Sequence, residues 1–144
     1  MRGPGRSGFR AVHLASGRVL ASRLQVPRTP LGRALGLMFR APLQAGEGMW
    51  IAPCGGIHTC FLFGSIDAVF LDREHRVLRV RERLAPWRAV PLVRGAHGVL
   101  ELPPGTAAEV GLRPGDRLLI AAVAAPQAPR GEPTALSEEG PSIP

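Results

Sequence analysis

Two cysteines and a histidine lie close together in the middle of this 144-residue chain, at Cys54, His58 and Cys60. Thiolate and imidazole groups are the ligands that zinc prefers, and a structural zinc site needs four ligands in a tetrahedral arrangement. The segment supplies three, it has no Cys-x-x-Cys pair, and its spacing demands no particular fourth ligand. We therefore predict neither a metal nor another cofactor, and we interpret both cysteines as small apolar groups of the core.

The same segment contains the residue types of a nucleophilic catalyst. Cys54 could serve as the nucleophile, His58 as the general base, and Asp67 as the group that orients the base. The chain lacks a Gly-x-Ser-x-Gly elbow and a cysteine-protease signature, so only residue type and proximity support this interpretation. A small metal-dependent or cysteine-based hydrolase is therefore the alternative, and we favour a protein that is not an enzyme.

Asp67 attracts attention for a second reason, because it lies in an otherwise apolar segment. A carboxylate on such a strand must face solvent, bind a cation or accept hydrogen bonds from charged groups. We predict one polar cluster of Arg40, His58 and Asp67, and favour a structural role for it over ligand binding. Glu101, by contrast, alternates with leucines and is predicted to face solvent.

The only two tryptophans, Trp50 and Trp87, each lie near a proline-marked loop. Together they could form an aromatic wall for a sugar or a peptide. Tryptophans in such positions more often lie at the rim of a core, and we favour that interpretation while keeping the wall as a hypothesis.

The arginines are concentrated at one end of the chain. All 18 basic residues are arginine, and eight of them fall in the first forty residues, where there is no acidic residue. Such a basic end can attract nucleic acid, anionic lipid or an acidic protein surface. We do not expect a dedicated site, and keep polyanion binding through these N-terminal arginines as a minor alternative.

The composition and the positions of turn-forming residues divide the chain into three parts. A hydrophobic content of 45% with 20% charged residues excludes a disordered polyelectrolyte, a coiled coil and a collagen-like fibre. We predict a flexible basic leader over 1–10, a single β domain over 11–120 and a proline-rich disordered tail over 121–144. We find neither a signal-peptide pattern nor an apolar run of the roughly 18 residues that span a bilayer, so we expect a cytoplasmic protein.

Short apolar runs separated by turn residues predict a mainly β fold, with two short helices and an antiparallel β-sandwich or barrel-like sheet. Gly17 should turn a hairpin. Thr29 should cap a helix that places Leu35 and Met38 inward and ends at Arg40, and Thr106 should cap a second helix. The predicted strands cover 11–14, 18–24, 48–53, 57–63, 66–71, 76–84, 99–102 and 117–120.

Seven short motifs occur in a distinctive order: GLMFR at 36–40, GMWI at 48–51, IHT at 57–59, IDAVFLD at 66–72, PWR at 86–88, VLELPPGT at 99–106 and GLRPGD at 111–116. In this the chain resembles the bacterial and archaeal family called domain of unknown function 192, from Val19 to Leu119. The resemblance implies a mainly β single domain with no established activity.

Relatives in this family often occur beside cell-envelope and pilus-secretion components, which implies an accessory role with a protein partner from such machinery. The chain departs from the family pattern at Leu62, Gly64 and Ser65, where similar sequences carry a Met and a Phe-Pro. Losing that proline should loosen the local bend. Our first hypothesis is a small non-enzymatic binding or accessory module that presents loops to a protein partner or a small ligand.

Overall fold

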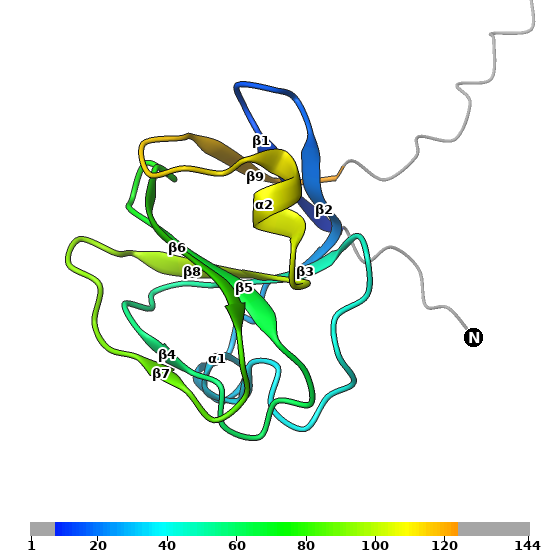
Figure 1. The fold of residues 1–144 in the computed structure, drawn as a ribbon, viewed down its shortest axis with the longest axis vertical. Coiled ribbons are helices and arrows are strands. Elements are labelled where there is room, and N and C mark those ends of the chain that lie inside the picture. The colour runs from blue at the N-terminus through cyan, green and yellow to red at the C-terminus, as the bar shows by residue number, and fades with distance from the viewer. Residues whose placement is uncertain (1–7, 124–144) are drawn as a thin grey trace, which may run out of the picture.

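A curled sheet of seven strands and a smaller sheet of two strands make up the computed structural model, which describes residues 8–123 (Figure 1). The large sheet has the strand order β6-β5-β8-β3-β2-β1-β9, and β4 pairs with β7 in the small one. The mainly β prediction is confirmed. The strands are β1 (Phe9–His13), β2 (Val19–Gln25), β3 (Glu47–Ile51), β4 (Ile57–His58), β5 (Ile66–Leu71), β6 (Val77–Leu84), β7 (Ala89–Val90), β8 (Gly98–Leu102) and β9 (Leu118–Ala122), and the helices are α1 (Pro30–Leu35) and α2 (Thr106–Val110).

Neighbouring strands run antiparallel with one exception, the parallel pair β2 and β3. The predicted antiparallel pairing therefore holds for every pair except this one. Parallel neighbours need a long crossover, and residues 26–46, which include α1, provide one. The hairpin of β1 and β2 forms as predicted, with Gly17 at a φ of 70° in its turn.

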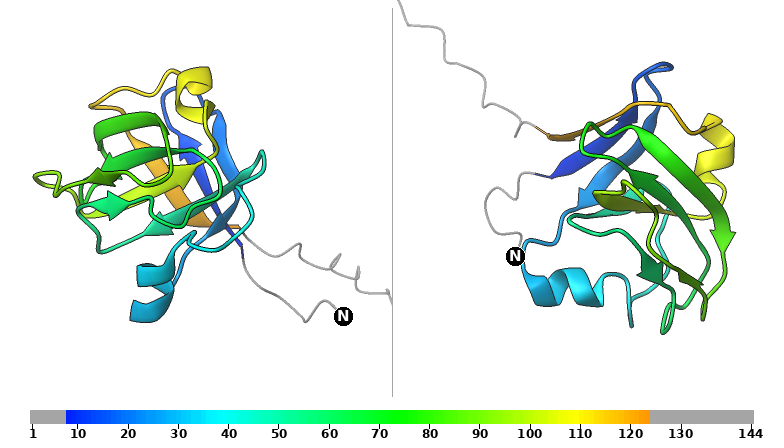
Figure 2. Two further views of the ribbon diagram at one scale, coloured as in Figure 1. Left: turned by 60° about the horizontal axis from the view of Figure 1, so that its bottom comes forward. Right: turned by 90° about the vertical axis from the view of Figure 1, so that its left-hand side faces the viewer.

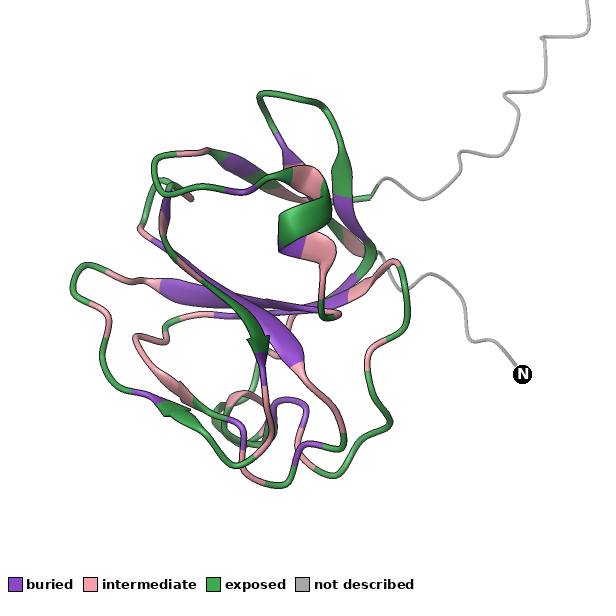
Figure 3. Ribbon diagram, viewed as in Figure 1, coloured by how far each residue is buried: buried purple, intermediate pink, exposed green. Residues whose placement is uncertain are grey.

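Two neighbouring strands of the large sheet, β5 and β8, are buried at every position (Figure 3). Side chains alternate between the faces of a sheet. On one face, Val69, Leu71 and Leu100 pack with residues of β1, β2, β9 and α2. On the other face, Phe70 and Val99 pack with residues of the loops around β4 and β7. The large sheet thus carries a core on each side.

Helix α1 begins as predicted and ends earlier. The Thr29 hydroxyl accepts a hydrogen bond from the Gly32 amide at 2.9 Å, and proline follows at the first helical position. The helix stops at Leu35 and none of its residues is buried, so the predicted inward face and the end at Arg40 are wrong. At Gly36 the chain turns with a φ of 49°, and Leu37 then enters the core. The two helices lie at opposite ends of the molecule (Figure 2).

Two further local predictions need correction. Helix α2 has Gly105 as its N-cap with no side-chain capping bond, because Thr106 is already the first helical residue; its hydroxyl donates to the Pro103 carbonyl at 2.8 Å. The predicted strand over 57–63 is confined to Ile57–His58, because the chain turns after His58 and Phe61 takes a φ of 63°.

The ends of the domain extend slightly beyond the predicted boundaries. Phe9 of β1 pairs with Ala122 of β9, so both strands reach two residues further than expected. Most of the predicted leader (1–7) and tail (124–144) lies outside the described residues. Between residues 8 and 123, no helix is long and apolar enough to cross a membrane.

Asp67 joins three elements on the α2 side of the large sheet. It is fully buried, and one carboxylate oxygen accepts a hydrogen bond from the Arg83 amide near the end of β6 at 2.9 Å. The other oxygen accepts from the Ala107 amide in the first turn of α2, also at 2.9 Å. Hydrogen bonds to a charged acceptor are stronger than neutral ones, so this carboxylate holds β5, β6 and α2 together.

Replacing Asp67 should therefore cost the fold much stability. We expect Asp67→Asn to lower the free energy of unfolding by about 2 to 4 kcal/mol, and Asp67→Ala by more, because buried amides lose their acceptors. Asp72→Asn is the matched control, since Asp72 also accepts from two amides, those of Glu74 and Arg76, in a polar turn. It should cost about 1 kcal/mol or less. Urea unfolding curves measure all three, and equal midpoints for Asp67→Asn and the parent would contradict the assignment.

Candidate functional site

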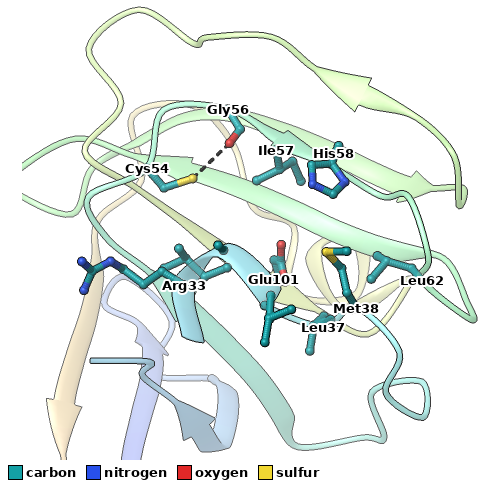
Figure 4. A pocket seen from close by; sticks show the side chains of 13 residues that line it. Arg33, Leu37, Met38, Cys54, Gly56, Ile57, His58, Leu62 and Glu101 are labelled. Atoms are coloured by element: carbon teal, nitrogen blue, oxygen red, sulfur yellow. Dashed lines mark hydrogen bonds between the residues drawn. The ribbon is translucent and has the colours of Figure 1, made fainter. Parts of the chain in front are cut away.

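A pocket of about 310 Å³ opens on the other face of the large sheet, between the α1 segment and the segment that leads into β4 (Figure 4). This volume is at the lower end of the range for small-molecule sites. Most of its wall is apolar. The side chains that matter for its chemistry are Arg33, Leu37, Cys54, His58, Leu62 and Glu101.

Glu101 is the acidic residue of this pocket. Its position in β8 pairs with Ala68 and Met49, so its side chain lies on the face opposite Asp67. It is only 5% exposed, and its Oε2 atom has no hydrogen-bond partner within the described structure. Burial raises the pKa of Glu101 to about 7. In Figure 4 the carboxyl group points into the space between the two walls.

The prediction that Glu101 faces solvent is therefore wrong. Its alternation with Leu100 and Leu102 does place it on the opposite face from those leucines, but that face is covered by a second core. A strand with apolar residues on both faces is typical of a strand buried on both sides. The apolar neighbour Val99, on the same face as Glu101, was the signal that could have identified this burial.

Cys54 and His58 both line the pocket, which a catalytic site containing both residues would require. The Cys54 thiol donates a hydrogen bond to the Gly56 carbonyl at 3.0 Å. Burial, with a smaller contribution from Glu101, raises the pKa of the Cys54 thiol, so little thiolate is present near neutral pH. Asp67 lies across the sheet and its oxygens are taken by backbone amides. The structure thus assembles two members of the predicted catalytic set and not the third.

The structure also places the three residues of the predicted polar cluster apart from one another. Arg40 donates to the Gln25 side chain at 2.6 Å, His58 lies in the pocket, and Asp67 binds the amides of Arg83 and Ala107. The hydrogen-bonded cluster of Arg40, His58 and Asp67 does not form. The reason is that α1 ends before Arg40, and that backbone amides satisfy the carboxylate. The described part of the chain contains no group of three His, Cys, Asp or Glu side chains that could hold a metal ion.

The two tryptophans do not form a shared wall. Trp50 is 7% exposed, belongs to the core on the Asp67 side and contacts the His75 ring edge-on at 5.4 Å. Trp87 is 61% exposed and packs edge-on against Phe61 at 4.8 Å. Phe61 in turn lies 4.9 Å from Phe39. The exposed aromatic surface is therefore built from Trp87 and two phenylalanines that sequence reasoning missed.

Comparison with known proteins places the chain in a family. The domain of unknown function 192 family, DUF192, described as "Uncharacterized ACR", matches residues 11–120. The chain belongs to this family. The resemblance drawn from the seven motifs is thereby confirmed, and the matched range covers the pocket, the exposed aromatic residues and all of the large sheet except the outer ends of β1 and β9.

Individual DUF192 relatives agree with this assignment. The UPF0127 protein of Pyrococcus horikoshii is 37% identical over 92 residues, which cover 60% of this chain and 76% of the relative. The UPF0127 protein of Pyrococcus abyssi is 32% identical over 101 residues, with coverage of 67% and 84%. A crystal structure of a protein of unknown function from Novosphingobium aromaticivorans DSM 12444 superposes with a TM-score of 0.67 at 26% identity, covering 83% of this chain and 91% of that one.

Glu101 makes the stability of this DUF192 domain depend on pH. Because its pKa is raised from 4.5 to about 7 in the folded protein, the folded state holds the proton more tightly than the unfolded chain. The free energy of unfolding should therefore fall as the pH rises through this window, by about 3 kcal/mol at about 1.4 kcal/mol per unit.

We expect Glu101→Gln to remove this loss, because glutamine keeps the shape and cannot ionise. The variant should be more stable than the parent at pH 8, and its advantage should shrink toward pH 4.5. Urea unfolding at several pH values measures this, with Glu82→Gln on the exposed face of β6 as the control. An advantage that stays constant with pH would show that ionisation of Glu101 is not the cause.

Proposed function

We propose that this DUF192 domain is a non-enzymatic binding module whose pocket takes a small organic cation, or a side chain that carries one. The single observation that carries the proposal is the buried, unpartnered Oε2 atom of Glu101 at the pocket. A protonated amine would bind there, and the attached hydrocarbon would pack against Leu37, Ile51 and Leu62.

The energetic cost of burying an ionised carboxylate is the reason for proposing a cation as the ligand. An ionised carboxyl group without a partner is costly in dry surroundings, and an ammonium group supplies both a compensating charge and three donors. Arg33 also lines the pocket, but it donates to the Arg28 carbonyl at 3.2 Å. Figure 4 shows its guanidinium directed away from Glu101, so it does not neutralise that carboxylate.

The Cys54 thiol, whose pKa is raised, favours a binding function for the pocket over a hydrolytic one. A cysteine nucleophile needs a lowered pKa and a nearby base, whereas burial raises the pKa of Cys54 and its hydrogen bond goes to a carbonyl. His58 gains no orienting bond from Asp67, because Asp67 lies on the other face of the sheet. These contacts support a pocket that holds a ligand without reacting with it.

Butylammonium is a suitable probe, titrated calorimetrically in phosphate buffer so that no buffer amine competes. We expect it to bind the parent at pH 8 and to bind Glu101→Gln at least tenfold more weakly. Affinity should fall by about tenfold from pH 8 to pH 6, because protonation of Glu101, with its pKa of about 7, removes the attracting charge. Butanol, a neutral probe of the same shape, should bind weakly and without pH dependence.

His58 and Cys54 are the other titratable groups that line the pocket, so each needs its own variant. The pH dependence should persist in His58→Gln and in Cys54→Ser, and vanish only in Glu101→Gln. The proposal fails if butanol binds as tightly as butylammonium, or if Glu101→Gln leaves the butylammonium affinity unchanged.

A further inference from the structure

Three exposed aromatic side chains form a continuous strip beside the pocket, which we call the aromatic ledge: Phe39, Phe61 and Trp87. Their exposed fractions are 59%, 43% and 61%, and the ring centroids of successive members lie 4.9 and 4.8 Å apart. Contiguous aromatic surface of this kind on a single domain commonly marks a binding site. The rings contact one another and still leave much of their surface to solvent.

The backbone of the ledge adopts an unfavourable conformation. Phe39, Phe61 and Trp87 have φ angles of 60°, 63° and 62°, in the left-handed region that bulky L residues rarely adopt. In the described chain only two other non-glycine residues, His75 and Arg83, have a positive φ. Strained residues of this kind persist where the surroundings enforce them, and they cluster at functional sites.

Identifiable hydrogen bonds hold the ledge in this conformation. The Phe39 amide donates to the Phe61 carbonyl, and the Trp87 amide donates to the Thr59 carbonyl, each at 3.1 Å. Thr59 is fully buried, and its hydroxyl contacts the Ala85 carbonyl at 2.6 Å and accepts from the Arg88 amide at 2.8 Å. The fold therefore keeps three large rings in solvent at a cost in backbone strain, which points to a role outside folding.

The ledge and the pocket share their supporting segments. Met38, next to Phe39, and Leu62, next to Phe61, both line the pocket. Figure 4 shows these two side chains on the same side of the space into which Glu101 points. A ligand that fills the pocket and continues on that side would reach the ledge.

We infer that the ligand is an extended peptide segment, with a lysine side chain in the Glu101 pocket and, two positions along the peptide, an aromatic side chain on the ledge, because alternate side chains of an extended segment share a face. The inference rests on the proposed function of the pocket. Charge complementarity with Glu101 selects the basic residue, and the ledge selects the aromatic one.

The small sheet favours a peptide over a free amine. Among the described residues β4 pairs with β7 alone, so its other edge has no strand partner there, and both of its residues, Ile57 and His58, line the pocket. An extended segment can add to such an edge through main-chain hydrogen bonds, while its side chains enter neighbouring pockets. A free amine would use neither the strand edge nor the ledge.

The test uses a fluorescein-labelled peptide, Gly-Phe-Gly-Lys-Gly-Phe-Gly-amide, in which lysine and both phenylalanines share one face of the extended chain, titrated by fluorescence anisotropy at pH 8. Matched peptides replace the lysine by glutamine or both phenylalanines by glycine. We expect each replacement to weaken binding to the parent at least tenfold. With the unlabelled peptide, the emission of Trp87 should shift to the blue, since the only other tryptophan, Trp50, is already buried.

Protein variants separate the ledge from the pocket. Trp87→Gly should bind the peptide that carries lysine and two phenylalanines at least tenfold more weakly, yet bind butylammonium as the parent does. Its urea midpoint should not fall, because glycine relieves the strain at a positive φ, so a loss of peptide affinity could not be attributed to unfolding. Leu14→Ala, at an exposed leucine in the β1–β2 turn, is the control and should change neither affinity.

The outcomes distinguish the two proposals. If butylammonium binds in a Glu101-dependent way but the peptide binds no better than its glycine-substituted form, the peptide inference is overturned and the pocket proposal stands. If Trp87→Gly lowers the unfolding midpoint and leaves peptide affinity intact, the ledge is structural and the inference is overturned. If neither probe depends on Glu101, both proposals fall.

Discussion

The burial of β5 and β8 on both faces is the constraint on which the rest of this structure depends. A polar side chain on either strand has no access to bulk water, whichever way it points, and must find a partner in the protein or remain without one. The two strands carry two carboxylates, Asp67 and Glu101, which point to opposite faces. Asp67 is met by two backbone amides, whereas Oε2 of Glu101 has no hydrogen-bond partner among residues 8–123. Burial on both faces thus produces a hydrogen-bonded carboxylate on one side, which we call the Asp67 clamp, and the candidate site around Glu101 on the other.

The Asp67 clamp and the candidate site are connected through the residues that follow β6. Asp67 binds the amide of Arg83, one residue before the end of β6. The next residues reach the buried hydroxyl of Thr59, which contacts the Ala85 carbonyl and the Arg88 amide. Trp87 lies between these two anchored positions. Loss of the Asp67 bond would therefore remove one anchor of this segment and leave the Thr59 bonds to hold the ledge, since Asp67 itself contacts neither the pocket nor the ledge.

Local signals in the sequence were sufficient for the elements that depend on a few neighbouring residues. The hairpin at Gly17 and the start of α1 at Thr29 follow from turn and capping chemistry within four or five positions, and both are confirmed. The need of Asp67 for hydrogen-bond donors was also predictable, because a carboxylate in an apolar strand requires them. The donors themselves were not, since every residue except proline carries an amide and the sequence does not mark those of Arg83 and Ala107.

The candidate site was missed because it is created by contacts between distant segments. Period-two alternation correctly separates Glu101 from its leucine neighbours, but it cannot tell whether the second face meets water. That depends on the α1 segment and the loop before β4, which lie far away in the sequence. The ledge is harder still, because a positive φ at Phe39, Phe61 or Trp87 contradicts the preference of those residues and leaves no composition signal.

The positions at which local prediction fails also help to distinguish structural residues from candidate functional residues. On the Asp67 side of the sheet, the buried carboxylate is satisfied and the residues packed around it form a closed core. On the Glu101 side, one buried oxygen has no partner within the part of the chain that the structure describes, and three rings are held in solvent on a strained backbone. Glutamine at 101 and glycine at the positive-φ positions would suit the fold better. A sequence that departs from its own structural preferences at several positions of one surface is typical of a binding face, where complementarity to a partner outweighs the stability of the free domain.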